Sequence, residues 1–331
     1  MELLRVDDLK TYFYTYEGTV KALEGVSFTL DKGKTLGLVG ETGCGKSVTA
    51  LSITRLIPDP PGKIVSGRIL FNGRDLLKIS EDDMKAIRGK EISMIFQEPI
   101  MALNPVYTIG RQIAENVMLH DERVQSLSRR ERKAASWERA IETLKDVGIA
   151  EPERVAKSYP HELSGGMCQR AMIAMAMACN PLLLIADEPT TALDVTIQAQ
   201  ILELIKDLIK KFGSSVLVIT HNLGVVAETC DDVAVMYAGY IVEKGSVYSV
   251  FKEPLHPYTR GLMNAIPNVE KKRDRLNSIK GSVPNLISPP SGCRFHPRCE
   301  HAMKICSEKV PGLYEESEGH AVACWLYGGA K

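Results

Sequence analysis

The chain has 331 residues, enough for one large domain with an appendage, and its 41 Lys and Arg residues balance 41 Asp and Glu residues. With no net charge, the chain as a whole has no electrostatic attraction to nucleic acid or to an anionic membrane. The acidic N-terminus lacks the pattern of an export signal, and the most apolar stretches fall far short of the roughly 20 residues that cross a bilayer. We therefore expect a soluble chain that recognises its partners locally and binds no nucleic acid.

Strands are predicted at the start of the chain. β-Branched and aromatic residues over 3–13 and 20–30 favour two strands, and the turn at Glu17-Gly18 joins them as a hairpin. The same signal continues at 67–71 and 92–96. A short antiparallel sheet is therefore expected ahead of the next motif.

Residues 40–47 read Gly-Glu-Thr-Gly-Cys-Gly-Lys-Ser, between the apolar stretch 35–39 and the helix-compatible stretch 48–55. Strand, glycine loop and helix in this order are typical of a phosphate-binding loop. Its glycines let consecutive N–H groups face an anion, and the helix N-terminus adds positive potential. Lys46 is expected to contact β- and γ-phosphates, and Ser47 to ligate Mg²⁺. The nucleotide-binding residues predicted here are Gly40, Thr42, Gly43, Cys44, Gly45, Lys46, Ser47 and Val48.

Helices and strands alternate in the rest of the first 250 residues. Apolar residues at helical spacing over 111–119 and 129–148 predict a helical insertion. Strands at 182–186 and 215–219, with an amphipathic helix at 197–212 between them, predict a parallel sheet. A hairpin is expected at 233–243.

Two further motifs carry chemistry. The apolar strand at 182–186 ends in Asp187, placed to hold Mg²⁺, and Glu188, which could act as general base on an attacking water. Ahead of it, Ser164, Gly165 and Gly166 open a helix and form a second potential anion site. One fold needs only one γ-phosphate site, but the phosphate loop and the Ser-Gly-Gly motif would face different ways. We therefore expect the motif of one subunit to complete the site of another across a dimer.

The order of these motifs resembles an ATP-binding cassette (ABC) ATPase over roughly residues 1–250. The resemblance implies that Gln97 senses Mg²⁺ or water and links the helical insertion to a transport partner. It also implies that Asp194 is the D-loop residue, counted among the nucleotide-binding residues, and that His221 is the switch histidine that contacts the γ-phosphate. Asp187 and Glu188 keep the roles given above, and Glu188, His221 and Gln97 form the predicted catalytic set.

In such ATPases an aromatic ring near the end of the first strand stacks on adenine. This chain offers several aromatic residues there, and Phe13 is favoured because it stands four residues after Leu9, as in the family pattern. Tyr14 and Tyr16 are alternatives, because the hairpin is longer than in many cassettes.

Proline, glycine and charge increase after about Lys252, which predicts a domain boundary. The stretches 255–263 and 293–299 resemble the oligopeptide/dipeptide importer ATPases. That family also includes importers of nickel complexes and oligosaccharides, so the cargo stays open.

Four cysteines crowd the last 40 residues, at Cys293, Cys299, Cys306 and Cys324. Four thiolates suit tetrahedral zinc or an iron–sulfur cluster. A 4Fe-4S cluster is favoured over zinc, because members of the resembled group carry one. A disulfide is the third option, against which the expected cytosolic setting argues.

The expected fold is an α/β P-loop NTPase with a RecA-like parallel sheet core, an antiparallel β-subdomain, an α-helical insertion at about 98–175 and a small Cys-rich C-terminal domain. The nucleotide-binding domain is placed at 1–252 and the C-terminal domain at 253–331. The resemblance implies an ATPase that powers di- or oligopeptide import with two transmembrane permease subunits and a second ABC ATPase. It would lie peripherally on the cytoplasmic face of the inner membrane, with an extracytoplasmic peptide-binding protein as indirect partner. The rival is a soluble ABC ATPase of DNA repair or translation.

Overall fold

Two sets of strands organise the described residues of the computed structural model, which are 1–191, 193–265 and 279–328. Contacts divide the chain into two units. The first unit holds Met1 and residues 31–34 and 78–218, and the second holds residues 2–30, 35–77 and those from 219 onward.

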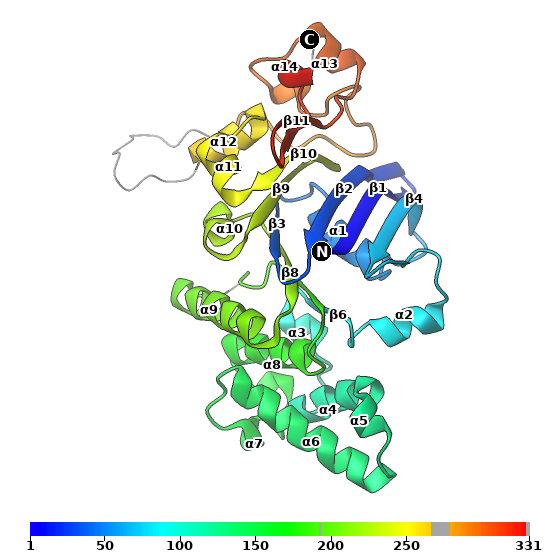
Figure 1. The fold of residues 1–331 in the computed structure, drawn as a ribbon, viewed down its shortest axis with the longest axis vertical. Coiled ribbons are helices and arrows are strands. Elements are labelled where there is room, and N and C mark those ends of the chain that lie inside the picture. Colours follow the sequence, from blue (N-terminus) through cyan, green and yellow to red (C-terminus); the bar gives the residue numbers. More distant parts are fainter. Residues whose placement is uncertain (192, 266–278, 329–331) are drawn as a thin grey trace. The chain divides into compact units, whose positions relative to one another are not determined.

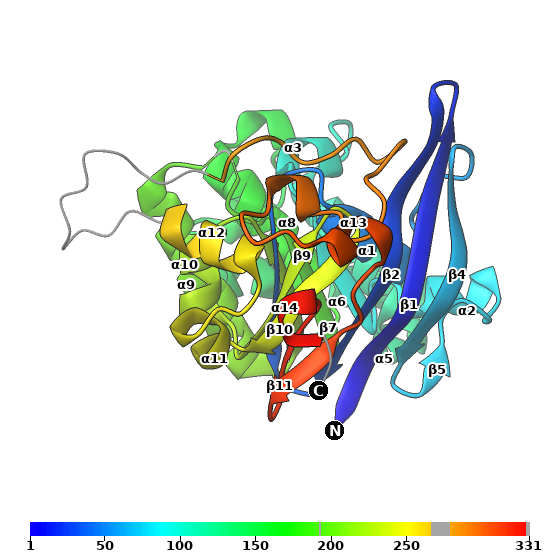
Figure 2. The same cartoon turned by 90° about the horizontal axis from the view of Figure 1, so that it is seen from above.

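The second unit contains an antiparallel sheet near the N-terminus (Figures 1 and 2). Its strand order is β2-β1-β4-β5, and β1 pairs with β4 so that Leu4 faces Phe71. The strands are β1 (Glu2–Thr15), β2 (Gly18–Asp31), β4 (Gly62–Phe71) and β5 (Arg74–Asp75). The predicted antiparallel sheet is therefore present, and β4 begins five residues before the predicted strand at 67–71.

The same unit carries a second group of strands in the order β11-β12-β10-β9-β3. β3 and β9 run parallel, whereas β9, β10, β12 and β11 pair antiparallel. These strands are β3 (Thr35–Val39), β9 (Asp232–Tyr237), β10 (Tyr240–Ser246), β11 (Tyr314–Ser317) and β12 (His320–Val322). The C-terminal strands thus lie in the same sheet as β3, the strand before the glycine loop.

Short helices complete this unit (Figure 1). They are α1 (Lys46–Ile53), α10 (Leu223–Thr229), α11 (Val247–Lys252), α12 (Pro257–Ala265), η2 (His296–Arg298), α13 (Lys304–Glu308) and α14 (Trp325–Gly328). An aromatic core joins β9, α12 and the segment before η2: the ring of Tyr237 lies 4.6 Å from that of Tyr258 and 5.1 Å from that of Phe295. Burial lowers the pKa of the neighbouring His256 to about 3, so this core residue stays neutral.

The first unit combines strands in the order β8-β7-β6 with a group of helices (Figure 1). β6 (Ile92–Ile95) and β7 (Leu183–Asp187) run parallel, with Ile92 opposite Leu183, and β8 spans Ser215–Thr220. The helices are α2 (Glu81–Ile87), α3 (Pro99–Ala102), α4 (Ile109–His120), α5 (Glu122–Gln125), α6 (Arg129–Asp146), α7 (Pro152–Val155), η1 (Pro160–Glu162), α8 (Gly165–Met177) and α9 (Val195–Phe212).

The helical insertion forms where the apolar spacing predicts it. In α6 the buried side chains Ser136, Ala140, Thr143 and Leu144 recur at helical period, and α4 packs against this face. Ser128 begins α6 with a capping box, because its hydroxyl accepts from the Glu131 N–H and the Glu131 carboxylate accepts from the Ser128 N–H. The division into domains at residue 252 stays a prediction. No helix of the described ranges has both the length and the apolar character to span a bilayer.

Candidate functional site

The glycine loop joins the wholly buried strand β3 to α1, as predicted. A Cβ at Gly40 would lie 2.1 Å from the carbonyl oxygen of Met236, so only glycine fits there. Gly45, with φ +106°, caps α1 in the left-handed region that favours glycine. Close packing and backbone conformation therefore both account for the glycines of this loop.

Lys46 is the first residue of α1, and its side chain folds back over the loop. Its Nζ donates to the carbonyl oxygens of Gly40 at 2.9 Å and Glu41 at 3.1 Å. The Cys44 side chain is fully buried, which raises the pKa of its thiol, so this residue can offer a ligand only its main chain. Ser47 and Val48 follow in the first turn of α1, where N–H groups face the helix N-terminus.

Residues far along the chain hold the loop from outside. The Glu41 N–H donates to the Tyr258 hydroxyl at 2.8 Å, and the Glu41 carboxylate pairs with Arg298 at 2.7 Å. The Gly239 N–H donates to the Cys44 carbonyl oxygen at 2.9 Å. The sequence motifs did not identify Tyr258 and Arg298 as residues that contact this loop. The only sequence feature that pointed to such a partner is the carboxylate of Glu41 within a loop predicted to bind anions.

In the first unit, the side chains of Gln97 and Glu188 are hydrogen-bonded to each other. The Gln97 Nε2 lies 3.2 Å from the Glu188 Oε2, which also accepts from the Thr191 hydroxyl at 2.9 Å. Glu188 follows the buried strand β7 with φ +45°, a conformation that costs energy for a residue with a Cβ. Asp187 ends β7 and is 4% exposed. The fold thus fixes this carboxylate pair on a rigid strand end.

Ser164 begins helix α8 as its N-cap, and its hydroxyl accepts from the Met167 N–H at 3.4 Å. Gly165, the first helical residue, is exposed, and Gly166 is half-buried. Deeper in the same helix, the buried Gln169 donates to the Pro189 carbonyl oxygen at 2.7 Å, just after Glu188. This bond ties the helix behind the Ser-Gly-Gly motif to the segment that carries the carboxylates.

Asp194 lies at the start of a helix, and His221 lies just after a strand. Asp194 is the exposed N-cap of α9 in the first unit, and its carbonyl oxygen accepts from the Gln198 N–H at 2.9 Å. His221 belongs to the second unit and follows β8 directly, with an exposed side chain. Both are placed on short connections that follow strands, where parallel sheets present ligand-binding groups.

The aromatic residues at the end of β1 differ in their surroundings. A Cβ at Gly62 would lie 2.8 Å from the ring of Phe13, so this ring packs closely on the start of β4. The Tyr12 hydroxyl donates to Glu24 at 2.7 Å. Tyr14 is 52% exposed and Tyr16 fully exposed, so their rings are the accessible ones.

The four C-terminal cysteines are all free thiols, which disagrees with a disulfide. Burial, with a smaller contribution from the neighbouring Cys306, Cys324 and Cys299, raises the pKa of Cys293 to about 11. However, no group of three or more His, Cys, Asp or Glu side chains in the described ranges is arranged to hold a metal ion. The structure therefore does not confirm the predicted metal site, nor a Cys-rich C-terminal domain built around it, and the tail instead joins the sheet through β12.

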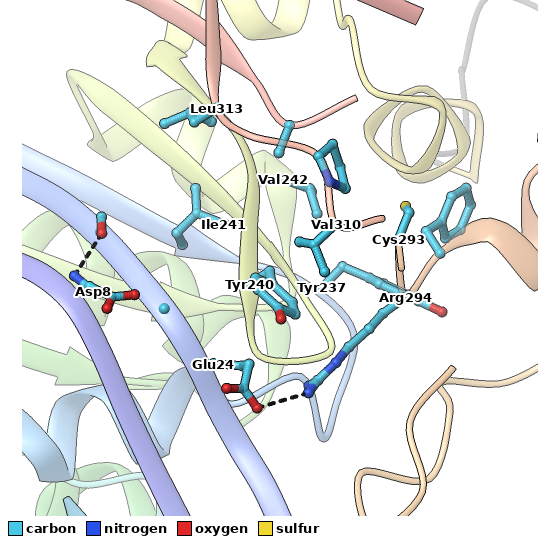
Figure 3. A pocket seen from close by; sticks show the side chains of 15 residues that line it. Asp8, Glu24, Tyr237, Tyr240, Ile241, Val242, Cys293, Arg294, Val310 and Leu313 are labelled. Atoms are coloured by element: carbon cyan, nitrogen blue, oxygen red, sulfur yellow. Dashed lines mark hydrogen bonds and ion pairs between the residues drawn. The ribbon is translucent and has the colours of Figure 1, made fainter. Parts of the chain in front are cut away.

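A cavity of about 220 Å³ lies beside this tail (Figure 3). Arg294 points across it toward Glu24, 3.4 Å away, and also donates to the carbonyl oxygens of Lys21 and Ala238. The apolar side chains of Val310 and Leu313 complete the wall. Arg294 thus anchors the segment after Cys293 to β2, in the unit that contains the glycine loop.

Comparisons with known proteins agree with these features. The family description "ABC transporter" matches residues 23–191, and "Oligopeptide/dipeptide transporter, C-terminal region" matches residues 242–306. A probable peptide ABC transporter ATP-binding protein of Sinorhizobium fredii is 56% identical, over 98% of this chain and 94% of its own length. The oligopeptide transport ATP-binding protein AppD of Bacillus subtilis is 52% identical, over 98% of this chain and 97% of its own.

Solved structures give the same picture of the fold. A dimeric bacterial ABC transporter cassette superposes with a TM-score of 0.64 at 27% identity, covering 74% of this chain and 98% of that one. A dimeric cassette in a post-hydrolysis state, bound to ADP and phosphate, gives a TM-score of 0.61 at 28% identity, with the same coverage. The α/β fold of these cassettes is therefore also the fold of this chain.

Proposed function

This chain belongs to the ABC transporter family and carries the C-terminal region of oligopeptide/dipeptide transporters, and we propose that it hydrolyses ATP to power di- or oligopeptide import. One observation carries the proposal: the Glu188 carboxylate is held 3.2 Å from Gln97 directly after a buried strand, in a chain whose glycine loop ends on Lys46. Relatives named for peptide transport support the cargo.

The residues of the loop bind the phosphates in this proposal. Lys46 exchanges its bonds to the loop carbonyls for β- and γ-phosphate oxygens, and the loop amides of Gly43, Cys44 and Gly45 donate to the same anion. Ser47, Gln97 and Asp187 would hold Mg²⁺, which supplies charge neutralisation at the phosphates when bound. The hard oxygen donors of these three side chains fit that ion.

Glu188 is the proposed general base. It accepts a proton from water while Gln97 and Thr191 fix the direction of its carboxylate, and His221 contacts the γ-phosphate. The strained backbone of Glu188 is consistent with this role, because such conformations persist where the surroundings hold a reactive group in place.

A second ABC ATPase completes the site. Ser164, Gly165 and Gly166 offer their exposed helix start to ATP bound by the partner's loop, and Asp194 lies at the same interface. Closure of such a pair would move two transmembrane permease subunits. In this proposal the chain lies peripherally on the cytoplasmic face of the inner membrane, and a peptide-binding protein acts from the outside. The dimeric cassettes among its structural relatives support this arrangement.

Adenine stacking is assigned to the end of β1. Phe13 remains the first candidate from motif position, whereas the accessible rings of Tyr14 and Tyr16 support the alternatives. An exposed ring can stack on a base without disturbing the β1–β4 packing.

We also propose that the four C-terminal cysteines hold a 4Fe-4S cluster. Support comes from the four free thiols and from the burial of Cys293 near Cys306, Cys324 and Cys299, which raises the pKa of the Cys293 thiol. Four thiolates suit the ligation of such a cluster. Zinc is the alternative.

Anaerobic purification followed by absorption spectroscopy and metal analysis tests the cluster. We expect a brown protein with about four irons per chain, and loss of the colour in Cys306→Ser, because Cys306 is the most buried of the four thiols. Cys230→Ser is the control, since this cysteine lies outside the C-terminal group. One equivalent of zinc without iron, or no metal, would contradict the cluster.

Affinity purification of the tagged chain from membranes tests the transport function. We expect two polytopic permease proteins to be recovered with it, and a peptide-stimulated ATPase after reconstitution with a peptide-binding protein. Stimulation by nickel complexes or oligosaccharides instead would identify a related importer. Recovery of nucleic acid without permeases would refute transport and favour a soluble ABC ATPase.

A further inference from the structure

The glycine loop contains a carboxylate of its own. Glu41 stands between Gly40 and the residues proposed to receive phosphates, and its carbonyl oxygen accepts from the Lys46 Nζ at 3.1 Å. The residue is therefore next to the ammonium that would contact a triphosphate. An unpaired negative charge at this position repels such a polyanion, so the loop needs a cation that offsets Glu41.

Arg298 supplies that cation from the C-terminal region. Its Nη1 lies 2.7 Å from one Glu41 carboxylate oxygen and its Nη2 lies 3.0 Å from the other, a paired geometry that gives strong hydrogen bonds. The Arg298 side chain is 5% exposed and that of Glu41 30%, so water screens the pair only in part.

The remaining donors of Arg298 fix its direction. Its Nε donates to the Lys280 carbonyl oxygen at 2.9 Å, and its Nη1 to the Tyr237 hydroxyl at 3.3 Å. Its Nη2 also donates to the Gly281 carbonyl oxygen at 3.3 Å. The hydrogen bond to Glu41 is the main cause that raises the pKa of the guanidinium. A guanidinium held this way stays charged and keeps one orientation.

A second C-terminal residue holds the main chain at the same position. The fully buried Tyr258 of α12 accepts the Glu41 N–H, and its ring packs on Tyr237, whose hydroxyl also meets Arg298. Glu41 is therefore held at its amide by one C-terminal element and at its carboxylate by another.

We propose that Arg298 is a positioning residue of the ATP site, which neutralises Glu41 and holds its carboxylate on the C-terminal segment so that the loop keeps its affinity for ATP. This inference rests on the assignment of residues 40–47 to the nucleotide. It makes the C-terminal segment a working part of the nucleotide site, in addition to any role in transport.

Binding of Mg-ATP to the full-length chain, measured by titration calorimetry, tests this role in four proteins: wild type, R298Q, E41Q and the double variant. We expect R298Q to weaken the Kd about tenfold, because the carboxylate is left unpaired beside the phosphates. E41Q and the double variant should stay within about twofold of wild type, because neither carries that charge. In hydrolysis, R298Q should raise KM for ATP with little change in kcat.

Lys280→Gln is the matched control, because Lys280 pairs with Glu300 at 3.5 Å on the same segment while both side chains are largely exposed. It should bind ATP as wild type does. If R298Q binds ATP normally, or if the double variant is as weak as R298Q, Arg298 does not act through the charge of Glu41 and the proposal is overturned.

Two further variants keep the test decisive. If R298Q loses its cooperative thermal transition, R298K replaces it: the ammonium keeps the charge but not the two parallel bonds, so we expect a smaller loss that E41Q removes. Absence of that rescue overturns the proposal. Lys46→Ala tests the assumption on which this inference rests, that residues 40–47 bind the nucleotide. Normal ATP binding in this variant would show that this assignment is wrong.

Discussion

Glu188→Gln is expected to reduce ATP hydrolysis by about three orders of magnitude while ATP binding stays within about twofold of wild type. The amide matches the carboxylate in size and its oxygen can still accept from the Thr191 hydroxyl, which lies 2.9 Å away. It cannot accept a proton from water at neutral pH. The variant should therefore hold ATP and accumulate as an ATP-bound dimer.

Single-turnover phosphate release and equilibrium ATP binding separate these two properties. Glu203→Gln is the matched control, because Glu203 is an exposed carboxylate on α9 of the same unit. It should hydrolyse ATP at the wild-type rate. Retained hydrolysis in Glu188→Gln would refute the assignment of Glu188 as general base.

Local patterns predicted the parts of the site that are local in sequence. The glycine loop was predicted because strand, glycines and helix follow one another within about twenty residues, and the structure places β3 and α1 on either side of it. Gln97 and Glu188 are 91 residues apart, and their proximity of 3.2 Å follows from motif order in a resembled family rather than from either residue alone. Parallel pairing of β6 and β7 explains it, because both residues follow the ends of neighbouring strands.

The contacts made by the C-terminal region could not be predicted in this way. Arg298 and Glu41 are 257 residues apart, and no period or spacing connects them. The strands β11 and β12 are short, with four and three residues, so their signal in the sequence is weak. Their pairing with β10 comes from tertiary packing, which propensity does not encode. The tail was therefore expected to be an appendage, whereas it adds strands to the sheet that contains β3.

The cysteines show a different limit of sequence reasoning. Their clustering in the last 40 residues indicated ligands, and in the structure burial, with a smaller contribution from nearby Cys306, raises the pKa of both Cys293 and Cys299. Hydrogen bonds from the Cys293 N–H to the Cys306 carbonyl oxygen and from the Met303 N–H to the Cys306 Sγ contribute to holding this turn. Protein bonds thus hold part of the geometry, and metal analysis decides what the thiols bind.

Gly165→Asp is expected to reduce the ATPase rate of the assembled transporter at least about a hundredfold and to leave folding intact. A Cβ at Gly165 meets only the Leu193 side chain at 3.9 Å, an ordinary contact, so the substitution fits the fold. A carboxylate in the first turn of a helix also favours the helix itself by a few tenths of a kcal/mol. The same negative charge repels a triphosphate presented by the partner's loop.

ATP binding to the isolated chain distinguishes a site shared between two subunits from a site within one. Gly165→Asp should bind ATP as wild type does, because its own loop at residues 40–47 is unchanged, and only hydrolysis in the assembled transporter should fall. Gly165→Ala is the control, since it adds a Cβ without charge and should lose much less activity. Weakened ATP binding by the isolated Gly165→Asp chain would contradict a shared site, because the Ser-Gly-Gly motif would then act on nucleotide bound by its own subunit.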